Sequence, residues 1–231
     1  MRASDRRVVV FFGSLGSGKT EAALNYALWL ARTEPVRLVD LDLVTPLFRS
    51  RDAEGALRRR GVMVAGPPPE LWLADLPVLP AQVRAALAPP GPVVLDVGGG
   101  EAGSRVMGCL AAFLVPGEYE AWFVVNPYRP FTRTPGGIAS SLRAMERAAG
   151  FSATGLVSNP HLGAETRVEE VLSGHRVVRE AASEVGLAIR FLCVTRDRAL
   201  EVARSGVGDP VFPLTRFMKA PWERSAEAQE G

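Results

Sequence analysis

The stretch that decides the fold runs from residue 8 to residue 20 and reads VVVFF-GSLGSGKT. Its first five residues are all apolar, as expected of a short strand that is buried on both faces of a sheet. The segment Gly13–Thr20 matches G-x-x-x-x-G-K-[ST] at every fixed position. Apolar residues then recur at helical spacing from Thr20 to Arg32. A strand, a glycine-rich loop and a helix in this order predict a phosphate-binding loop (the P-loop, residues 13–20).

The residue types in the P-loop suit nucleotide binding. The predicted contacts to the nucleotide come from Gly13, Ser14, Gly16, Ser17, Gly18, Lys19 and Thr20. Glycines let the backbone bend and turn N–H groups inward, and the helix adds its positive dipole end. Lys19 is predicted to act in catalysis at the β- and γ-phosphates, and the Thr20 hydroxyl to bind Mg²⁺. A chance glycine-rich turn is the alternative, although Lys19 is one of only two lysines in the chain, with Lys219.

Strand-like and helix-like segments alternate along most of the chain. Further strands are predicted at residues 36–40, 62–64, 93–97, 121–125, 154–158 and 189–194. Helices are predicted at 20–32, 47–60, 80–88, 105–114, 135–149, 165–185 with a break near Gly174, and 197–204. This alternation predicts a three-layer α/β fold, with a mostly parallel sheet and helices on both faces. We predict a single P-loop nucleotide-binding domain over residues 1–222 and a polar, disordered tail over 223–231.

Composition narrows the classes of function. The net charge is only +2, which is too balanced for a nucleic-acid coat protein. The basic run Arg58–Arg60 could form a DNA-binding patch or the solvated face of a helix. Cys109 and Cys193 are too few and too far apart for a disulfide framework, and we interpret them as buried thiols. No apolar stretch is long enough for a membrane span, so a cytoplasmic protein is expected.

Three aspartates follow predicted strands. Asp40 and Asp42 lie at the end of the second strand, and Asp96 precedes three consecutive glycines. Ligands of open parallel sheets bind outside the carboxyl ends of the strands, so these acids lie on the edge where phosphates would bind. We interpret Asp96 as a magnesium ligand of the Walker B type, or alternatively as a helix cap. One acid of the pair could orient the attacking water while the other supports the metal; a solvated turn before Pro46 is the alternative.

Together these features resemble the MinD/ParA group of P-loop ATPases, which includes the nitrogenase iron protein and CobQ/CobB-type domains. The resemblance covers roughly residues 8–194 and rests on the P-loop, Val39–Asp42 with Pro46, Asp96, Val124–Pro127 and Gly155–Asn159. It implies a seven- or eight-stranded sheet and an ATP-dependent homodimer. It also implies that Asp42 positions the hydrolytic water, that Asp40 supports the metal shell and that Asn159 hydrogen-bonds the adenine.

The chain departs from this group within the P-loop. The group has a second lysine where this sequence has Ser14, and a neutral hydroxyl cannot stabilise charge on the γ-phosphate as a cation would. An arginine in a neighbouring loop could substitute for the missing lysine. The candidates are Arg49, Arg51, Arg105, Arg129 and Arg133.

The leading hypothesis is a slow Mg²⁺-dependent ATPase that acts as a nucleotide-dependent switch or assembly factor for an unknown protein partner. ATP is favoured over GTP because Ser158–His161 lacks the Asn/Thr-Lys-x-Asp pattern that reads guanine. The alternative is a small-molecule phosphoryl-transfer or ATP-dependent ligase enzyme of the CobB/dethiobiotin-synthetase branch. A metallocluster carrier is a third class and would need cysteines from two subunits. His161 and His175 are interpreted as isolated loop and helix residues.

Overall fold

The computed structural model describes residues 4–41, 55, 57–65 and 78–217. The strands of this part are β1 (Val8–Phe12), β2 (Val36–Leu41), β3 (Val62–Ala65), β4 (Val93–Val97), β5 (Tyr119–Val125), β6 (Gly155–Ser158), β7 (Ile189–Thr195) and β8 (Val211–Leu214). The helices are α1 (Lys19–Leu30), α3 (Val78–Leu87), α4 (Gly100–Ala111), the short 3₁₀ helix η3 (Pro130–Thr132), α5 (Pro135–Ala149), α6 (Val168–Val185) and α7 (Arg196–Arg204).

The strands form one sheet in the order β3-β2-β4-β1-β5-β6-β7-β8, and every neighbouring pair is parallel. The predicted α/β class is therefore confirmed. β1 lies near the centre, between β4 and β5, and the chain builds one side of the sheet before it crosses to the other. Ligands of open α/β sheets bind at such a switch point, so the P-loop leaves the sheet where a ligand site is expected.

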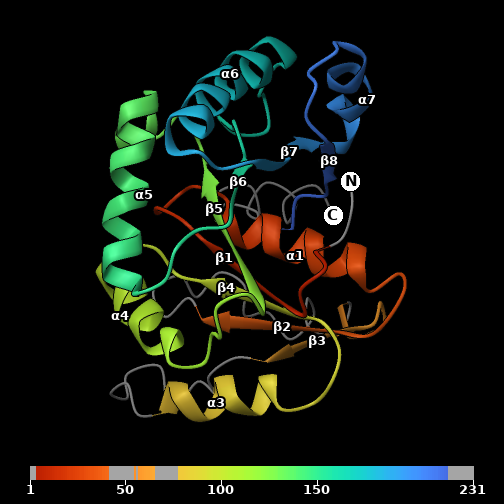
Figure 1. Cartoon of the computed structure of the whole chain (residues 1–231). Helices are drawn as coiled ribbons and strands as arrows, with labels where there is room; N and C mark the ends of the chain where they lie inside the picture. Colours follow the sequence, from red (N-terminus) through yellow and green to blue (C-terminus); the bar gives the residue numbers. More distant parts are fainter. Residues whose placement is uncertain (1–3, 42–54, 56, 66–77, 218–231) are drawn as a thin grey trace, which may run out of the picture.

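Helices cover both faces of the sheet (Figure 1). Along β1, Val8, Val10 and Phe12 belong to one core cluster, which includes residues of α3, α4, α5 and α6. Val9 and Phe11 belong to a second cluster, which includes the buried apolar residues of α1. Because side chains alternate between the faces of a strand, each face needs its own apolar residues. This explains why β1 is apolar without interruption.

The face beneath α1 is packed with aromatic rings. Tyr26 of α1 lies 4.9 Å from Trp122 and 5.5 Å from Phe11, measured between ring centroids. The Tyr26 hydroxyl accepts a hydrogen bond from the Ser4 backbone N–H at 3.0 Å, and burial raises the pKa of Tyr26 to about 12. These contacts hold α1 firmly on the sheet and so position its first turn, where Lys19 and Thr20 lie.

Three details of the fold differ from the sequence predictions. α4 runs from Gly100 to Ala111, whereas a helix was predicted at 105–114. α6 runs without a break through Gly174, which is buried. The prolines packed against it leave no room for a side chain, since an added Cβ would lie 2.7 Å from Pro160 and 2.9 Å from Pro127. The glycine therefore permits close packing and does not interrupt the helix. No strand was predicted at residues 211–214, where the structure has β8; its Pro213 is tolerated because β8 is an edge strand. Most of the predicted helix 47–60 and the tail 223–231 lie outside the described residues.

Candidate functional site

The P-loop connects the end of β1 to the start of α1. Gly16 and Gly18 have φ angles of 75° and 82°, a left-handed conformation that glycine adopts without strain. Gly13 packs against the neighbouring strand, because an added Cβ would lie 2.5 Å from the Val124 carbonyl oxygen. Lys19 opens α1 and is 5% exposed. The loop therefore has the bent glycine backbone and the helix N-terminus that a phosphate group requires.

Two of the predicted acids lie on the same face of the sheet as α1. Asp40 of β2 pairs in register with Asp96 of β4, and Asp96 pairs with Phe11 of β1. Strand alternation places Asp96 on the face of Val94, which packs in the α1 cluster. Asp96 is 2% exposed, whereas Asp40 is half-buried. The structure thus brings both carboxylates to the carboxyl edge beside the P-loop, and Asp42 lies outside the described residues.

The glycines after Asp96 pack against the P-loop itself. A Cβ added to Gly99 would lie 2.8 Å from the Leu15 nitrogen and 3.0 Å from the Gly13 carbonyl oxygen. α4 begins at Gly100 with Gly99 as its N-cap, and the cap has no side-chain hydrogen bond. Asp96 thus lies three residues before the N-cap of α4, and the choice between a magnesium ligand and a helix cap stays a prediction. A carboxylate, a hydroxyl at Thr20 and phosphate oxygens form the hard oxygen donor set that Mg²⁺ prefers, so these residues fit the ion.

Two asparagines lie at the strand ends on the other side of β1. The Asn159 side chain follows β6 and donates a hydrogen bond to the Ser17 carbonyl oxygen at 2.8 Å. Its amide nitrogen fills the space beside Gly18, because an added Cβ there would lie 2.1 Å from it. The Asn126 side chain follows β5 and donates to the His161 carbonyl oxygen at 2.8 Å and to the Gly16 carbonyl oxygen at 3.5 Å. Both amides thus hold P-loop carbonyls, and the adenine-reading role of Asn159 stays a prediction.

Arg129 reaches the P-loop from the same side. Its Nε donates a hydrogen bond to the Gly16 carbonyl oxygen at 3.0 Å, and its side chain is exposed. A Cβ at Gly16 would lie 2.8 Å from Nε, so the guanidinium covers this glycine. Arg129 was one of five arginines considered as a replacement for the missing lysine. Of the others, Arg133 is exposed, and Arg49, Arg51 and the side chain of Arg105 lie outside the described part of the chain.

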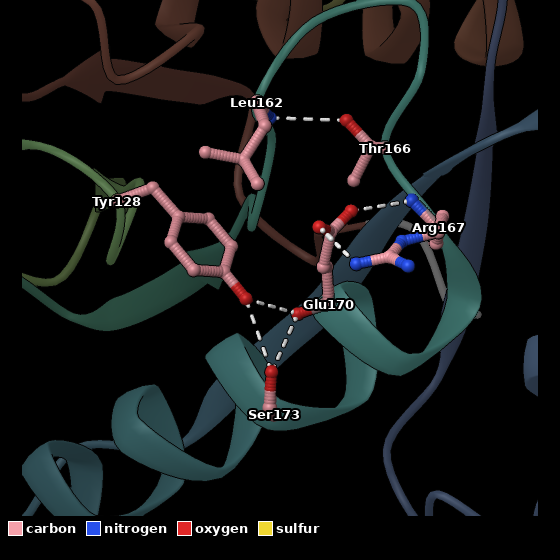
Figure 2. A network of polar contacts seen from close by, with 6 residues as sticks. All are labelled: Tyr128, Leu162, Thr166, Arg167, Glu170 and Ser173. Atoms are coloured by element: carbon pink, nitrogen blue, oxygen red, sulfur yellow. Dashed lines mark hydrogen bonds and ion pairs between the residues drawn. The ribbon is translucent and has the colours of Figure 1, made fainter.

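The loops after β5 and β6 are fastened to the first turns of α6 (Figure 2). The Tyr128 hydroxyl donates to the Glu170 carbonyl oxygen at 2.5 Å and lies 3.1 Å from Ser173 Oγ. The Arg167 backbone N–H donates to Glu170 Oε2 at 2.7 Å, which caps the helix. Gly174, one turn further on, leaves room for the prolines of both loops. The loops that carry the P-loop-binding donors Asn126, Arg129 and Asn159 are therefore held in place by contacts with α6.

His175 is not the isolated helix residue that was predicted. It is 1% exposed, its Nδ1 lies 3.0 Å from Ser158 Oγ, and its Nε2 lies 3.1 Å from Asp209 Oδ2. Burial lowers the pKa of His175, and the nearby carboxylate of Asp209 opposes this shift. Ser158 is fully buried and precedes Asn159, so the network supports the strand end behind the P-loop. The sequence carries no spacing signal for it, because its three members are far apart in the chain.

Other predicted features are placed as follows. Cys193 is buried, as predicted, and burial raises the pKa of its thiol, whereas Cys109 is only half-buried. Within the described residues no helix combines the length and apolar character that a membrane span needs. Cytoplasmic localisation stays a prediction.

Comparisons with known proteins bear on the fold. Neither a scan of protein-family models nor a search of curated proteins gave a match. Among solved structures, chloroplast FtsY from Physcomitrella patens is similar with a TM-score of 0.59 at 18% identity, over 91% of this chain. The signal recognition particle 54 kDa protein from Aeropyrum pernix, in complex with GDP, has a TM-score of 0.56 at 19% identity, over 83% of this chain. A nucleotide-binding protein from Archaeoglobus fulgidus, in complex with ADP, has a TM-score of 0.52 at 17% identity, over 87% of this chain.

This chain spans 63% of the FtsY chain, 42% of the signal recognition particle protein and 86% of the Archaeoglobus fulgidus protein. At identities below one fifth, these likenesses show a shared α/β fold. They do not support the narrower MinD/ParA assignment, which stays a prediction.

Proposed function

We propose that this chain binds ATP with Mg²⁺ and is a slow ATPase that works as a nucleotide-dependent switch. The observation that carries the proposal is the juxtaposition at the carboxyl edge of the sheet. A glycine loop with a buried lysine opens α1, and two aspartates of neighbouring strands lie on the same face beside it. Phosphate and a divalent cation are the ligands that these groups together would attract.

Each residue has a distinct task in this proposal. Backbone N–H groups of the P-loop and Lys19 bind the phosphates. Thr20 and Asp96 hold Mg²⁺, and Asp40 supports the metal shell. When bound, Mg²⁺ neutralises charge that develops on the phosphoryl oxygens. Asp42, which would orient the attacking water, lies outside the described residues, and its role is a prediction.

The choice of ATP rests on the strand end after β6. Ser158–His161 lacks the acid that would pair with guanine, and the side chain of Asn159 already contacts the P-loop. The similar structures were obtained with GDP in one case and ADP in another, so the fold is compatible with either base. ATP and GTP therefore have to be compared directly.

The switch character rests on the contact between Gly99 and the P-loop backbone. The contact is so close that it leaves no room for a side chain, and Gly99 directly precedes α4. A bound phosphate that moves the P-loop backbone would therefore also move the start of α4. A protein partner, or a second copy of the chain, would read the altered loops. Both the partner and the nucleotide-dependent homodimer are proposals.

The test is calorimetric titration of Mg-ATP and Mg-GTP, with phosphate release followed in the same samples. Lys19→Ala is the matched variant and should weaken binding by about 1.5–3 kcal/mol for each charge-assisted hydrogen bond lost. Binding of ATP with slow release, both lost in Lys19→Ala, supports the proposal. If neither nucleotide binds, the proposal is wrong; phosphate release that needs a small-molecule acceptor would instead favour a phosphoryl-transfer enzyme.

A further inference from the structure

Arg129 is an exposed cation that the fold holds against the P-loop. The turn after β5 is wound tightly: the Arg129 backbone N–H donates to the Asn126 carbonyl oxygen at 3.2 Å, and the Thr132 N–H donates to the Arg129 carbonyl oxygen at 3.0 Å. The Thr132 hydroxyl closes the same turn on the Asn126 carbonyl oxygen at 2.6 Å. The position of Arg129 is thus set by its backbone, before any ligand arrives.

The guanidinium uses little of its hydrogen-bonding capacity. Its Nε donates to the Gly16 carbonyl oxygen at 3.0 Å, and within the described residues no carboxylate forms an ion pair with it. An arginine has five N–H donors in a planar fork, so the Nη groups retain donors for a further ligand. The guanidinium that carries these donors lies over Gly16, a glycine of the P-loop.

A bound nucleotide would bring several negatively charged phosphate oxygens to the P-loop, and Lys19 is the only lysine of the P-loop. We propose that Arg129 is the second phosphate-binding cation of this site, contacting the phosphate chain of the bound nucleotide through its Nη groups while Nε stays on Gly16. This inference rests on the proposed function, because it needs a nucleotide in the P-loop.

Two substitutions separate the charge of Arg129 from its hydrogen bond. In Arg129→Gln, the side-chain N–H₂ lies as many bonds from the backbone as the arginine Nε, so the bond to Gly16 can be kept without charge. In Arg129→Lys, the charge is kept but no donor lies at that position. Arg133→Ala removes an exposed cation from the same loop and is the matched control.

The experiment is titration of Mg-ATP and Mg-GTP into the full chain and these variants, at low and high KCl, with urea unfolding to verify that each variant folds. We expect Arg129→Gln and Arg129→Ala to bind about tenfold more weakly or worse at low salt. Arg129→Lys should recover part of the loss, Arg133→Ala should match the wild type, and high salt should narrow the difference.

The opposite pattern would overturn the inference. If Arg129→Gln binds as the wild type does, the arginine serves only to hold Gly16, and the proposed function survives. If Arg129→Ala binds as the wild type does, Arg129 has no part in binding. Wild-type protein that binds neither nucleotide would overturn this inference and the proposed function together.

Discussion

The two sides of the P-loop carry different chemistry at equivalent positions. On one side, β2 and β4 place Asp40 and Asp96 on the α1 face of the sheet. On the other side, β5 and β6 are followed by Asn126 and Asn159, which approach the P-loop on that same face. An ionised carboxylate only accepts hydrogen bonds, whereas an amide also donates them. The asparagines can therefore hold P-loop carbonyls, which a carboxylate cannot do, whereas a carboxylate suits a cation.

Because of this difference, the two sides of the P-loop have different roles in the site. On the amide side, where β5 and β6 end, Asn126 and Asn159 fix backbone carbonyls of the P-loop. The Ser17 N–H donates to the Ser14 carbonyl oxygen at 3.1 Å, and the other N–H groups of the loop are the candidates to face a ligand. On the acid side, where β2 and β4 carry Asp40 and Asp96, the backbone at Gly99 contacts the P-loop without a side chain. We infer that the amide side positions the P-loop and that the acid side responds to the metal and the terminal phosphate.

The largest effect is expected where the amide side contacts the P-loop. Gly18→Ala places a side chain at a φ of 82° and 2.1 Å from the Asn159 amide nitrogen. We expect a loss of at least about 2 kcal/mol in the free energy of unfolding, because the left-handed backbone and the steric clash both cost energy. Nucleotide binding should be lost as well. Urea unfolding and calorimetry measure the two effects.

Gly136→Ala is the matched control for this substitution. Gly136 lies in the first turn of α5, with no atom within 4 Å of an added Cβ. It should leave binding unchanged and stabilise the helix by up to about 1 kcal/mol. Equal losses in the two variants would mean that the contact between Gly18 and Asn159 is unimportant.

The acid side is tested by Asp96→Asn, which keeps the shape of a side chain that is 2% exposed. We expect ATP affinity to fall about tenfold or more with Mg²⁺ present, because a neutral amide is a weak magnesium ligand. Affinity in EDTA should stay the same or rise, since a negative charge near the phosphates is removed. Titration under both conditions checks this, and a loss of affinity that does not depend on Mg²⁺ contradicts the metal role.

Asn159→Asp replaces the side-chain amide by a carboxylate, the group that Asp40 and Asp96 carry on the acid side. A carboxylate oxygen would face the Ser17 carbonyl oxygen, where the amide now donates at 2.8 Å. Asn159→Ala should cost about 1–3 kcal/mol in the free energy of unfolding, because a buried acceptor loses its donor, and Asn159→Asp should cost more. Urea unfolding ranks the three proteins. If Asn159→Asp is as stable as the wild type, the amide does not anchor the P-loop.

A smaller effect is expected from His175, which supports the amide side from behind through Ser158. Burial lowers the pKa of His175 below the value of 6.5 for the unfolded chain, even though the Asp209 carboxylate opposes this, and Arg179 also faces Asp209. The unfolded chain therefore binds the proton more readily. The contribution of His175 to stability is complete above pH 6.5 and decreases as the pH falls through the lowered pKa, by at most about 1.4 kcal/mol per pH unit.

Urea unfolding between pH 5 and pH 8 measures this dependence. His175→Gln removes the titrating ring and should flatten the pH profile on the acid side. If the profiles of the two proteins have the same slope, other groups account for the acid sensitivity.

The sequence was most informative where local chemistry decides the structure. The alternation of strand-like and helix-like segments predicted a parallel sheet, and the glycines and lysine of the P-loop predicted a phosphate site. The strand ends predicted where Asp40 and Asp96 lie. Helix α5 was predicted with the bounds that the structure shows, because Pro135 begins it and the αL residue Gly150 ends it. Asn159 was selected only by the resemblance, and Asn126 could have been recognised by the strand-end argument that selected Asp40 and Asp96.

Other features depend on contacts between segments that are distant in the chain. Gly174 looks like a helix breaker by itself, and only the prolines packed against it explain why the helix continues. His175 looks isolated until Ser158 and Asp209 are brought to it. The edge strand β8 forms because its backbone pairs in parallel with β7.

For the site itself, the sequence by itself determined the P-loop, its lysine and the acids at the strand ends, since residue type and strand alternation are local properties. Only the tertiary structure decided that Arg129, one of the two candidate arginines whose side chains are described, contacts the P-loop, and that the asparagines hold the loop from one side. Those contacts join residues more than a hundred positions apart, and a pattern within one segment carries no information about its distant neighbours.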